Sequence, residues 1–320
     1  MVRSPKLYNL GLSQRPINHN ANSSAPEVIP KEHWEVPSWI NEQVFEESAK
    51  LLEEKGVQYA SKVSYHQMCR WNSGMFYKHP ALKDVQYYWR VEPKVHFFCD
   101  VDYDVFRYMQ DNNKTYGFTI NLYDDPTSIE TLWPETTKFL AEHPDYLHEN
   151  NAMPWLTDNV RRPEHNNKAN GYSTCHFWSN FEIGNMDFWR SQAYEEYFNH
   201  LDRAGGFFYE RWGDAPVHSI ALGLFEDSSR IHWYVSDAPD PVPEAAGLLC
   251  NANRFPLVKQ VPRYRLPACS LPKLPQLAQV QGLQGRQDVP GRVLPPEGGL
   301  QAKLVQVRRA GVKEFYNVTI

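Results

Sequence analysis

The sequence predicts an α/β fold in which a central sheet is flanked by helices. Segments rich in β-forming residues alternate with segments whose apolar residues have helical spacing, and this alternation is typical of such folds. Aromatic residues make up 14% of the 320 positions and charged residues 22%, which suits a large core and excludes a disordered chain. The periodicity fades after Asp237, so we expect the ordered elements to lie before it.

The first strong helix signal covers Trp39 to Lys55. Ser38 can cap its start and Gly56 can end it. Apolar residues recur on one side, which we expect to face the core: Val44, Phe45, Leu51 and Leu52.

The middle of the chain alternates between strand and helix signals. Val-Gln-Tyr-Tyr-Trp-Arg-Val at 85–91 is typical of a buried strand. Further strands are predicted at 95–98, 115–122 and 174–183, and helices at 104–110 and 129–141. The polar, Asn-rich residues 145–172 predict a long surface loop.

Two more helices and a short strand complete the predicted core. Ser191 can cap a helix that Gly205 ends after Ala204. Asp214 can cap the next helix, with Pro216 in its first turn. Residues 231–235 predict the last strand.

The chain divides by composition into three parts. Residues 1–27 predict an unstructured leader, residues 28–238 the core, and residues 239–320 a Pro-rich tail that holds 11 of the 24 prolines. The tail has 11 basic and 5 acidic residues, whereas residues 1–238 have 22 and 33. Within the tail only residues 300–307 are apolar enough to predict an element.

Several function classes lose support from the sequence. A net charge of −5 does not favour a nucleic-acid partner, which requires a basic face. No apolar run approaches the ~18 residues of a membrane span. The five cysteines form no C-x-x-C pair, and there is no G-x-G-x-x-G, Walker, G-x-S-x-G or H-E-x-x-H motif.

Two stretches combine strands with charged residues. The strand at 85–91 runs into Arg90-Val91-Glu92-Pro93, and a carboxylate at a strand end can hold a divalent cation and its phosphates. A surface Arg90–Glu92 pair is the alternative. Glu182 lies within an aromatic strand, where it is a candidate acid, base or nucleophile. A water-facing Glu182 is the alternative.

Two further stretches carry polar residues beside aromatic rings. Asp214 can act as a helix cap, or it can bind a polyol at a helix start. His218, one turn later, is interpreted as a core or rim histidine. Tyr65, with His66 and Arg70, is compatible with one wall of a nucleotide or sugar site. A position at the edge of the core is the alternative.

Taken together, these stretches resemble the fungal α-1,2-mannosyltransferases of glycosyltransferase family 15. The resemblance runs from about Val28 to Asp237 and is carried by five motifs: Val28–Trp34, Met68–Arg70, Tyr88–Pro93, Cys175–Ile183 and Phe207–Ser219. It implies a GT-A-like fold and a retaining transfer of mannose from GDP-mannose to a terminal mannose of N- or O-linked glycans. It also implies Mn²⁺ and a luminal Golgi location as a type II membrane protein.

The resemblance also implies roles for individual residues. Glu92 matches the family's metal-binding Glu-Pro motif beside the phosphates, and Arg90 lies next to it. Glu182 matches the carboxylate proposed as nucleophile. Tyr65 and Asp214 match residues that line the donor and acceptor site.

The resemblance has two departures. The family's domain begins before the first motif, and after Asp237 its pattern continues with a metal-binding histidine, which has no counterpart here because the last histidine is His232. We therefore expect a chain incomplete at both ends, with weak or no activity, and an altered reading frame or a retained intron after codon 237. The rivals are a non-catalytic mannoside-binding or partner-binding remnant that uses Trp178 and Tyr209, and a glycosidase with Glu92 and Glu182 as its carboxylate pair.

Overall fold

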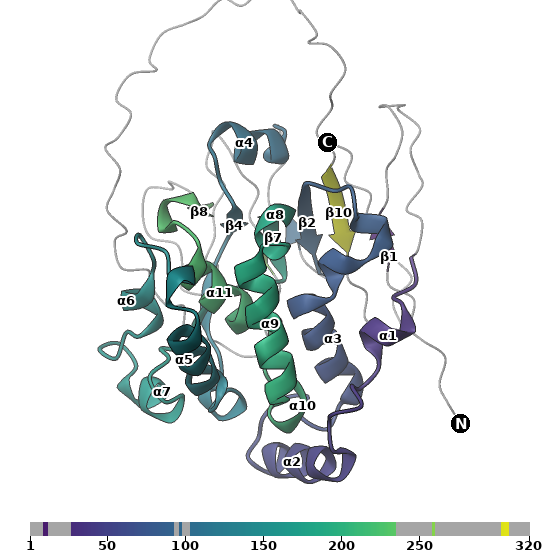
Figure 1. The fold of residues 1–320 in the computed structure, drawn as a ribbon, viewed down its shortest axis with the longest axis vertical. Helices are drawn as coiled ribbons and strands as arrows, with labels where there is room; N and C mark the ends of the chain where they lie inside the picture. The colour runs from purple at the N-terminus through teal and green to yellow at the C-terminus, as the bar shows by residue number, and fades with distance from the viewer. Residues whose placement is uncertain are drawn as a thin grey trace, which may run out of the picture.

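A mixed six-stranded sheet is the frame of the molecule (Figure 1). The computed structural model describes residues 9–11, 27–92, 96–97, 103–234, 258–259 and 302–306. β10 runs parallel to β2 and β8 parallel to β4, while the other pairings are antiparallel. In spatial order the strands are β1 (Asn9–Gly11), β10 (Ala302–Gln306), β2 (Tyr87–Val91), β7 (Phe181–Asn185), β4 (Tyr116–Phe118) and β8 (Ile231–Trp233).

Two short ladders stand apart from this sheet. β3 (His96–Phe97) pairs with β9 (Val258–Lys259), and β5 (Asn121–Tyr123) pairs with β6 (Cys175–Phe177). The predicted strand at 95–98 is therefore confirmed at two of its residues. β9 was not expected, because the prolines of the tail predicted no element before residue 300.

Three helices pack together beside the sheet: α3 (Val63–Gly74), α9 (Gln192–Ala204) and α11 (Asp214–Phe225) (Figure 1). Together with α5 (Leu132–Glu142), they bury the larger of the apolar clusters. α4 (Val105–Asp111) contributes to a second cluster with the side chains on the other face of β2 and β7. The remaining helices are α1 (Lys31–Trp34), α2 (Glu42–Glu54), α6 (Met153–Leu156), α7 (Pro163–Lys168), α8 (Met186–Trp189) and α10 (Gly206–Tyr209), and 3₁₀ turns cover Phe76–Lys78, Pro80–Leu82, Pro126–Ser128, Pro144–Tyr146 and Ser228–Arg230.

Helix α2 begins later than the sequence predicted. Asn41, not Ser38, caps it, because the Asn41 side chain accepts a hydrogen bond from the backbone N–H of Val44 at 3.1 Å. Phe45 faces the core as expected, but Val44 and Leu51 are 43% and 51% exposed. The expected apolar face was therefore too wide.

Two predicted strands are each broken in two. Residues 115–122 form β4 and β5, and residues 174–183 form β6 and β7. β4 and β7 stay in the main sheet, whereas β5 and β6 leave it and pair with each other. Period-two patterning shows which face a side chain takes, but it does not show where a strand changes sheet.

The segment 145–172 is not the irregular surface loop that its polar composition predicted. It contains α6 and α7, and Trp155 and Leu156 of α6 are buried. The Trp155 ring stacks on Phe177 with centroids 4.8 Å apart. A few well-spaced apolar residues therefore anchor this segment to the core.

Other expectations are confirmed. The Ser191 side chain caps α9, and Gly205 ends it with a φ of +80°, a left-handed conformation that favours glycine. β10 lies within the apolar residues 300–307 of the tail.

Two elements were not expected. β1 lies within residues 1–27, which were expected to be unstructured, and the rest of that segment lies outside the described residues. Helix α3 was not predicted at all. None of the described helices has the length and apolar character needed to cross a lipid bilayer.

Candidate functional site

Both faces of the sheet are covered by apolar residues, but one of them also carries buried charged side chains at its centre. In the antiparallel register of β2 and β7, Arg90 lies opposite Glu182, which also lies opposite Phe118 of β4. Trp89 and Ile183, their alternate neighbours, point into the second apolar cluster. Arg90 and Glu182 therefore share the other face, toward α3 and α11.

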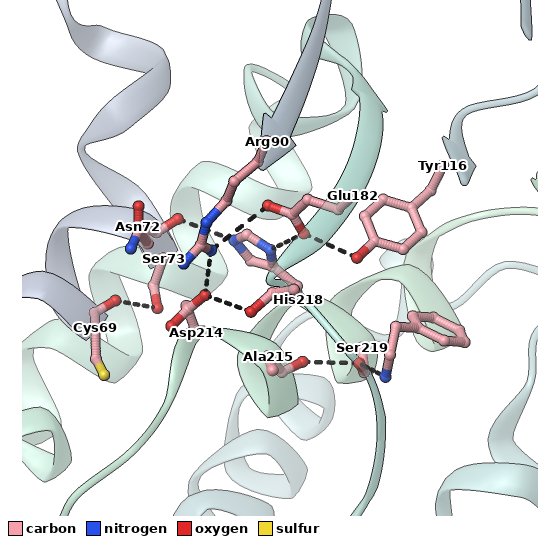
Figure 2. A network of polar contacts seen from close by, with 12 residues as sticks. Cys69, Asn72, Ser73, Arg90, Tyr116, Glu182, Asp214, Ala215, His218 and Ser219 are labelled. Atoms are coloured by element: carbon pink, nitrogen blue, oxygen red, sulfur yellow. Dashed lines mark hydrogen bonds and ion pairs between the residues drawn. The ribbon is translucent and has the colours of Figure 1, made fainter. Parts of the chain in front are cut away.

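Arg90 contacts three carboxylates, Glu92, Glu182 and Asp214, of which the last two are drawn in Figure 2. Its Nη1 lies 2.5 Å from Asp214 Oδ2 and 3.8 Å from Glu182 Oε1. Its Nη2 and Nε donate to Glu92 Oε1 at 2.7 and 3.1 Å. We call the side chains of Arg90, Glu92, Glu182 and Asp214 the Arg90 group. All four are buried, so neither a surface Arg90–Glu92 pair nor a water-facing Glu182 is found.

The electrostatic balance of this group is unusual for a protein interior. Burial lowers the pKa of Arg90, but Asp214, Glu92 and Glu182 outweigh it and hold that pKa well above its ordinary value. Among the residues that the structure describes, one guanidinium facing three carboxylates leaves an excess of negative charge. Folding alone does not require such an excess, so the group is a candidate functional site.

Asp214 does not act as the helix cap that the sequence predicted. Gly213 occupies the capping position of α11, and Asp214 Oδ2 accepts hydrogen bonds from Arg90 and from the Ser179 hydroxyl, the latter at 2.8 Å. Burial raises the pKa of Asp214, but Arg90, His218 and Ser179 outweigh burial and hold it below its ordinary value. Its carboxylate is thus kept ionised.

Glu182 is held by groups from β2, β4 and α11, which all lie on the same face of the sheet. Its Oε2 accepts a hydrogen bond from the Tyr116 hydroxyl at 2.8 Å and lies 3.2 Å from Nδ1 of His218. Its Oε1 faces Arg90. Burial raises the pKa of Tyr116 well above its ordinary value, and the negative charge of Glu182 raises it further. Tyr116 therefore stays a hydrogen-bond donor.

Tyr65 lies at a neighbouring ion pair. Its partly buried ring stacks on Tyr59 with centroids 4.7 Å apart, and the Arg211 guanidinium lies 5.8 Å from the ring centre. Arg211 Nη2 donates to Asp124 Oδ1 at 3.1 Å. Burial raises the pKa of Tyr65, and so does the negative charge of Asp214. Tyr65 thus lies within electrostatic range of the Arg90 group.

The described residues offer little for a metal ion. Glu92 has the carboxylate oxygens that Mn²⁺ prefers, but its Oε1 already accepts two hydrogen bonds from Arg90. Nowhere in the described ranges do three His, Cys, Asp or Glu side chains come together as a metal site would require. The described residues alone therefore do not make a metal centre. Residues 99–102, which the sequence places near Glu92, lie outside the described ranges.

Sequence reasoning missed four contributors to this region. Tyr116 and Ser179 lie on predicted strands without a distinguishing pattern, and the Arg211–Asp124 pair joins residues 87 positions apart. His218 was interpreted as a core or rim residue, and it is 1% exposed. Its position four residues after Asp214 places both on one face of a helix, and this spacing was a usable signal.

Trp178 and Tyr209, the two residues of the alternative in which the chain only binds mannosides, do not form one surface. Trp178 is 8% exposed and belongs to the second apolar cluster. Tyr209 packs against the larger cluster, and its hydroxyl accepts a hydrogen bond from the backbone N–H of Asn41 at 2.8 Å. The fold therefore gives no support to a mannoside site built from this pair.

Comparison with known proteins gives a consistent result. The family described as "Glycolipid 2-alpha-mannosyltransferase" matches residues 18–239. Among curated proteins, the "Probable mannosyltransferase KTR4" of Saccharomyces cerevisiae is 50% identical over 207 residues, which are 65% of this chain and 45% of that protein. The "O-glycoside alpha-1,2-mannosyltransferase omh1" of Schizosaccharomyces pombe is 45% identical over 235 residues, 71% of this chain and 58% of that protein.

Solved structures agree with the sequence comparisons. Core-mannan synthase A of Aspergillus fumigatus, in its Mn/GDP form, is 70% identical with a TM-score of 0.64, over 64% of this chain and 55% of that one. Ktr4p of S. cerevisiae in complex with GDP is 50% identical with a TM-score of 0.64, over 64% and 52%. The chain thus spans about half the length of the proteins it matches.

Proposed function

The chain belongs to the glycolipid 2-α-mannosyltransferase family, and from this premise we propose that its function is the transfer of mannose from GDP-mannose to a terminal mannose with retention of configuration, which this chain performs at a rate well below that typical of enzymes. The observation that carries the proposal is the Arg90 group, in which three buried carboxylates surround one guanidinium. A glycosyl transfer passes through a positively charged, oxocarbenium-like state. Fixed negative charges in a water-poor site stabilise such a state.

Within this proposal Glu182 is the carboxylate closest to the reacting sugar. Its Oε2 is fixed by Tyr116, and its Oε1 lies on the side of Arg90. An oxygen held in this way can stabilise the developing charge or attack the anomeric carbon. Tyr65 would line the sugar-binding side, because it lies beside the Arg211–Asp124 pair, whose polar atoms can bind hydroxyl groups. We propose that Asp214, whose charge acts on Tyr65, lines the same side.

The nucleotide and metal are extended to this chain from its relatives. The A. fumigatus synthase carries manganese and GDP, and the S. cerevisiae Ktr4p structure carries GDP. We propose that Arg90 and Glu92 mark the diphosphate end of the site, with Glu92 as the described residue nearest to a metal. Since the described residues do not form a metal centre, no step of the transfer is derived through it.

Location, acceptor and domain organisation are part of the same proposal. The names of the S. cerevisiae and S. pombe relatives describe mannosyltransferases, one of them acting on O-glycosides, which is consistent with glycan modification in the Golgi lumen. A mannosylated glycan is the proposed acceptor. We also propose that residues 28–238 form the catalytic core, and that residues 1–27 and 239–320 flank it and add β1 and β10 at one edge of its sheet.

A transfer assay with GDP-mannose and methyl α-mannoside tests the proposal, with and without Mn²⁺. We expect a disaccharide that a linkage-specific α-1,2-mannosidase cleaves, and GDP binding that Mn²⁺ strengthens. Glu182→Gln should retain GDP binding and lower transfer at least ~10²-fold, because it removes a charge that acts on the reacting sugar. Glu210→Gln is the matched control, because Glu210 contacts Trp212 and Thr131 instead of this group.

Two results would contradict the proposal. Binding of mannosides without any nucleotide dependence would favour a non-catalytic remnant of the family. Hydrolysis of mannosides without a nucleotide donor would favour a glycosidase that uses Glu92 and Glu182.

A further inference from the structure

His218 is a fully enclosed histidine whose two ring nitrogens both have partners. It lies on α11 one turn after Asp214 and is 1% exposed. Its Nε2 lies 3.0 Å from the backbone carbonyl oxygen of Asn72, and its Nδ1 lies 3.2 Å from Glu182 Oε2 (Figure 2). The ring therefore bridges α3 and β7.

These partners fix the number of protons. A carbonyl oxygen only accepts, so Nε2 of His218 must carry a hydrogen to bond with Asn72. A neutral imidazole protonated at Nε2 has a lone pair at Nδ1, which would face the carboxylate oxygen of Glu182. Two acceptors at that distance repel each other, so one more proton must lie between Nδ1 and Oε2.

The surroundings of Glu182 favour its ionised form. Oε2 already accepts a hydrogen bond from Tyr116, and Arg90 lies 3.8 Å from Oε1. A donated hydrogen bond and a nearby positive charge both stabilise a carboxylate. The additional proton therefore does not belong on Glu182.

The surroundings of His218 favour a cation. Its ring lies 4.3 Å from the ring of Trp189, with Phe76 at 6.1 Å and Tyr194 at 6.3 Å. Aromatic faces carry partial negative charge and attract cations within about 6 Å, a range that Trp189 meets and that Phe76 and Tyr194 do not. Gly184 makes this arrangement possible, because a Cβ there would come within 2.9 Å of Nε1 of Trp189.

The charged groups near the ring do not all act alike: Arg90 disfavours a second cation there, whereas the carboxylates of Glu182 and Asp214 favour it. α3 contributes only neutral groups near the ring, Asn72 and Ser73, and α9 contributes the Tyr194 hydroxyl, which donates to the Ser73 carbonyl. The sheet and α11 supply the charged and titratable groups: Arg90 and Tyr88 from β2, Tyr116 from β4, Glu182 from β7 and Asp214 from α11. With Glu92 beyond Arg90, the group holds three carboxylates and one guanidinium, so a second cation reduces the excess charge.

We propose that His218 is an imidazolium, the second cation of the site, and that it positions Glu182 by fixing Oε2 so that Oε1 is presented to the donor sugar. The protonation state follows from the geometry of this chain alone. The positioning role rests on the proposed function. The two parts are therefore tested by separate measurements.

NMR of the chain labelled with ¹⁵N-histidine tests the protonation state. Under the conditions of the transfer assay we expect both nitrogens of His218 to carry protons, which a neutral imidazole cannot provide. In Glu182→Gln the amide can donate to Nδ1, so the ring should become neutral with a proton on Nε2 only. Glu210→Gln should leave the doubly protonated signal unchanged. An unprotonated Nδ1 in the wild-type chain would overturn the proposal, wherever the remaining proton lies.

Transfer kinetics test the positioning role. We expect His218→Gln and His218→Phe to lower kcat ~10²-fold with little change in KM for GDP-mannose. A folded His218→Phe variant with wild-type kcat would overturn the role. If no variant and no wild-type chain transfers mannose, the proposed function fails while the NMR result still decides the protonation state.

Discussion

Two buried arginines in this molecule have very different surroundings. Arg70 of α3 meets Asp202 of α9 in a two-pronged pair, with Nε to Oδ1 at 2.7 Å and Nη2 to Oδ2 at 2.8 Å. Arg90 of β2 faces Glu92, Glu182 and Asp214. Arg70 therefore faces one negative charge, whereas Arg90 faces three.

The difference separates an ion pair that holds helices together from one that prepares a site. The Arg70–Asp202 pair joins two packed helices, and its charges cancel without any further partner. The Arg90 group concentrates negative charge on a strand pair and at a helix start, where it costs stability unless something positive joins it. We interpret the excess negative charge as the feature that stabilises a positively charged sugar during transfer.

The largest expected effect comes from removing each arginine. Arg90→Met leaves three carboxylates buried together, so we expect a loss of more than about 5 kcal/mol in the free energy of unfolding near neutral pH. Arg70→Met leaves one, and we expect about 3–5 kcal/mol. Urea unfolding at a series of pH values measures both.

The two arginine variants should also differ in acid. In Arg90→Met the crowded carboxylates bind protons more readily folded than unfolded, so stability should rise as the pH falls from neutrality. The gain should be smaller in Arg70→Met, which has a single such group. Equal losses with equal acid recovery would remove the distinction between the two regions.

A matched pair of aspartate substitutions tests the same contrast at a smaller scale. Asp202→Asn leaves Arg70 without a charged partner, and we expect a loss of about 3 kcal/mol with normal transfer by the folded protein. Asp214→Asn leaves Arg90 with two carboxylates, and we expect a loss below about 1 kcal/mol with transfer reduced ~10²-fold. Unfolding curves and transfer rates on the same preparations check both. Reversed patterns would show that the Asp202 side is the functional one.

The pH dependence of stability isolates Asp214. Because Arg90 and its other partners outweigh burial and lower the pKa of Asp214, its ionised form contributes stability above its unfolded pKa of about 3.9. That contribution is lost as the pH falls below this value through the folded pKa. We expect the wild-type midpoint of urea unfolding to fall more steeply below about pH 4 than that of Asp214→Asn. Parallel curves would mean that Asp214 is not held by Arg90 in solution.

Sequence patterns predicted the parts of the Arg90 group but not its assembly. The strand signal at 85–91 placed Arg90 and Glu92 two residues apart, and therefore on one face, and the aromatic strand signal singled out Glu182. Asp214 lies 124 residues from Arg90, and nothing local indicates that they meet. The register of β2 with β7 brings Arg90 and Glu182 together, and the packing of α11 adds Asp214.

Where local signals competed, tertiary contacts decided the outcome. Asp214 has the residue type and position of a helix cap, yet the Arg90 charge takes its carboxylate. Ser38 has the same cap chemistry as Asn41, but the backbone of Ile40 turns back to the Pro37 carbonyl and delays the helix. The α3 signal was missed because polar residues of that helix, His66, Arg70 and Asn72, are buried, which removes the usual amphipathic pattern.

The smallest expected effect lies at the edge of the Arg70 pair. Trp39 is 38% exposed, its ring lies 5.9 Å from the Arg70 guanidinium and 4.0 Å from that of Arg203, and its Nε1 donates to the Asp202 carbonyl at 3.0 Å. Trp39→Phe keeps an aromatic face and removes one hydrogen bond, so we expect a loss of about 1 kcal/mol and unchanged transfer. Urea unfolding against the wild-type chain measures it. A loss as large as that of Asp202→Asn would mean that the Arg70–Asp202 pair depends on the Trp39 ring. The ring would then be needed to keep water away from the two charges, because water weakens their attraction.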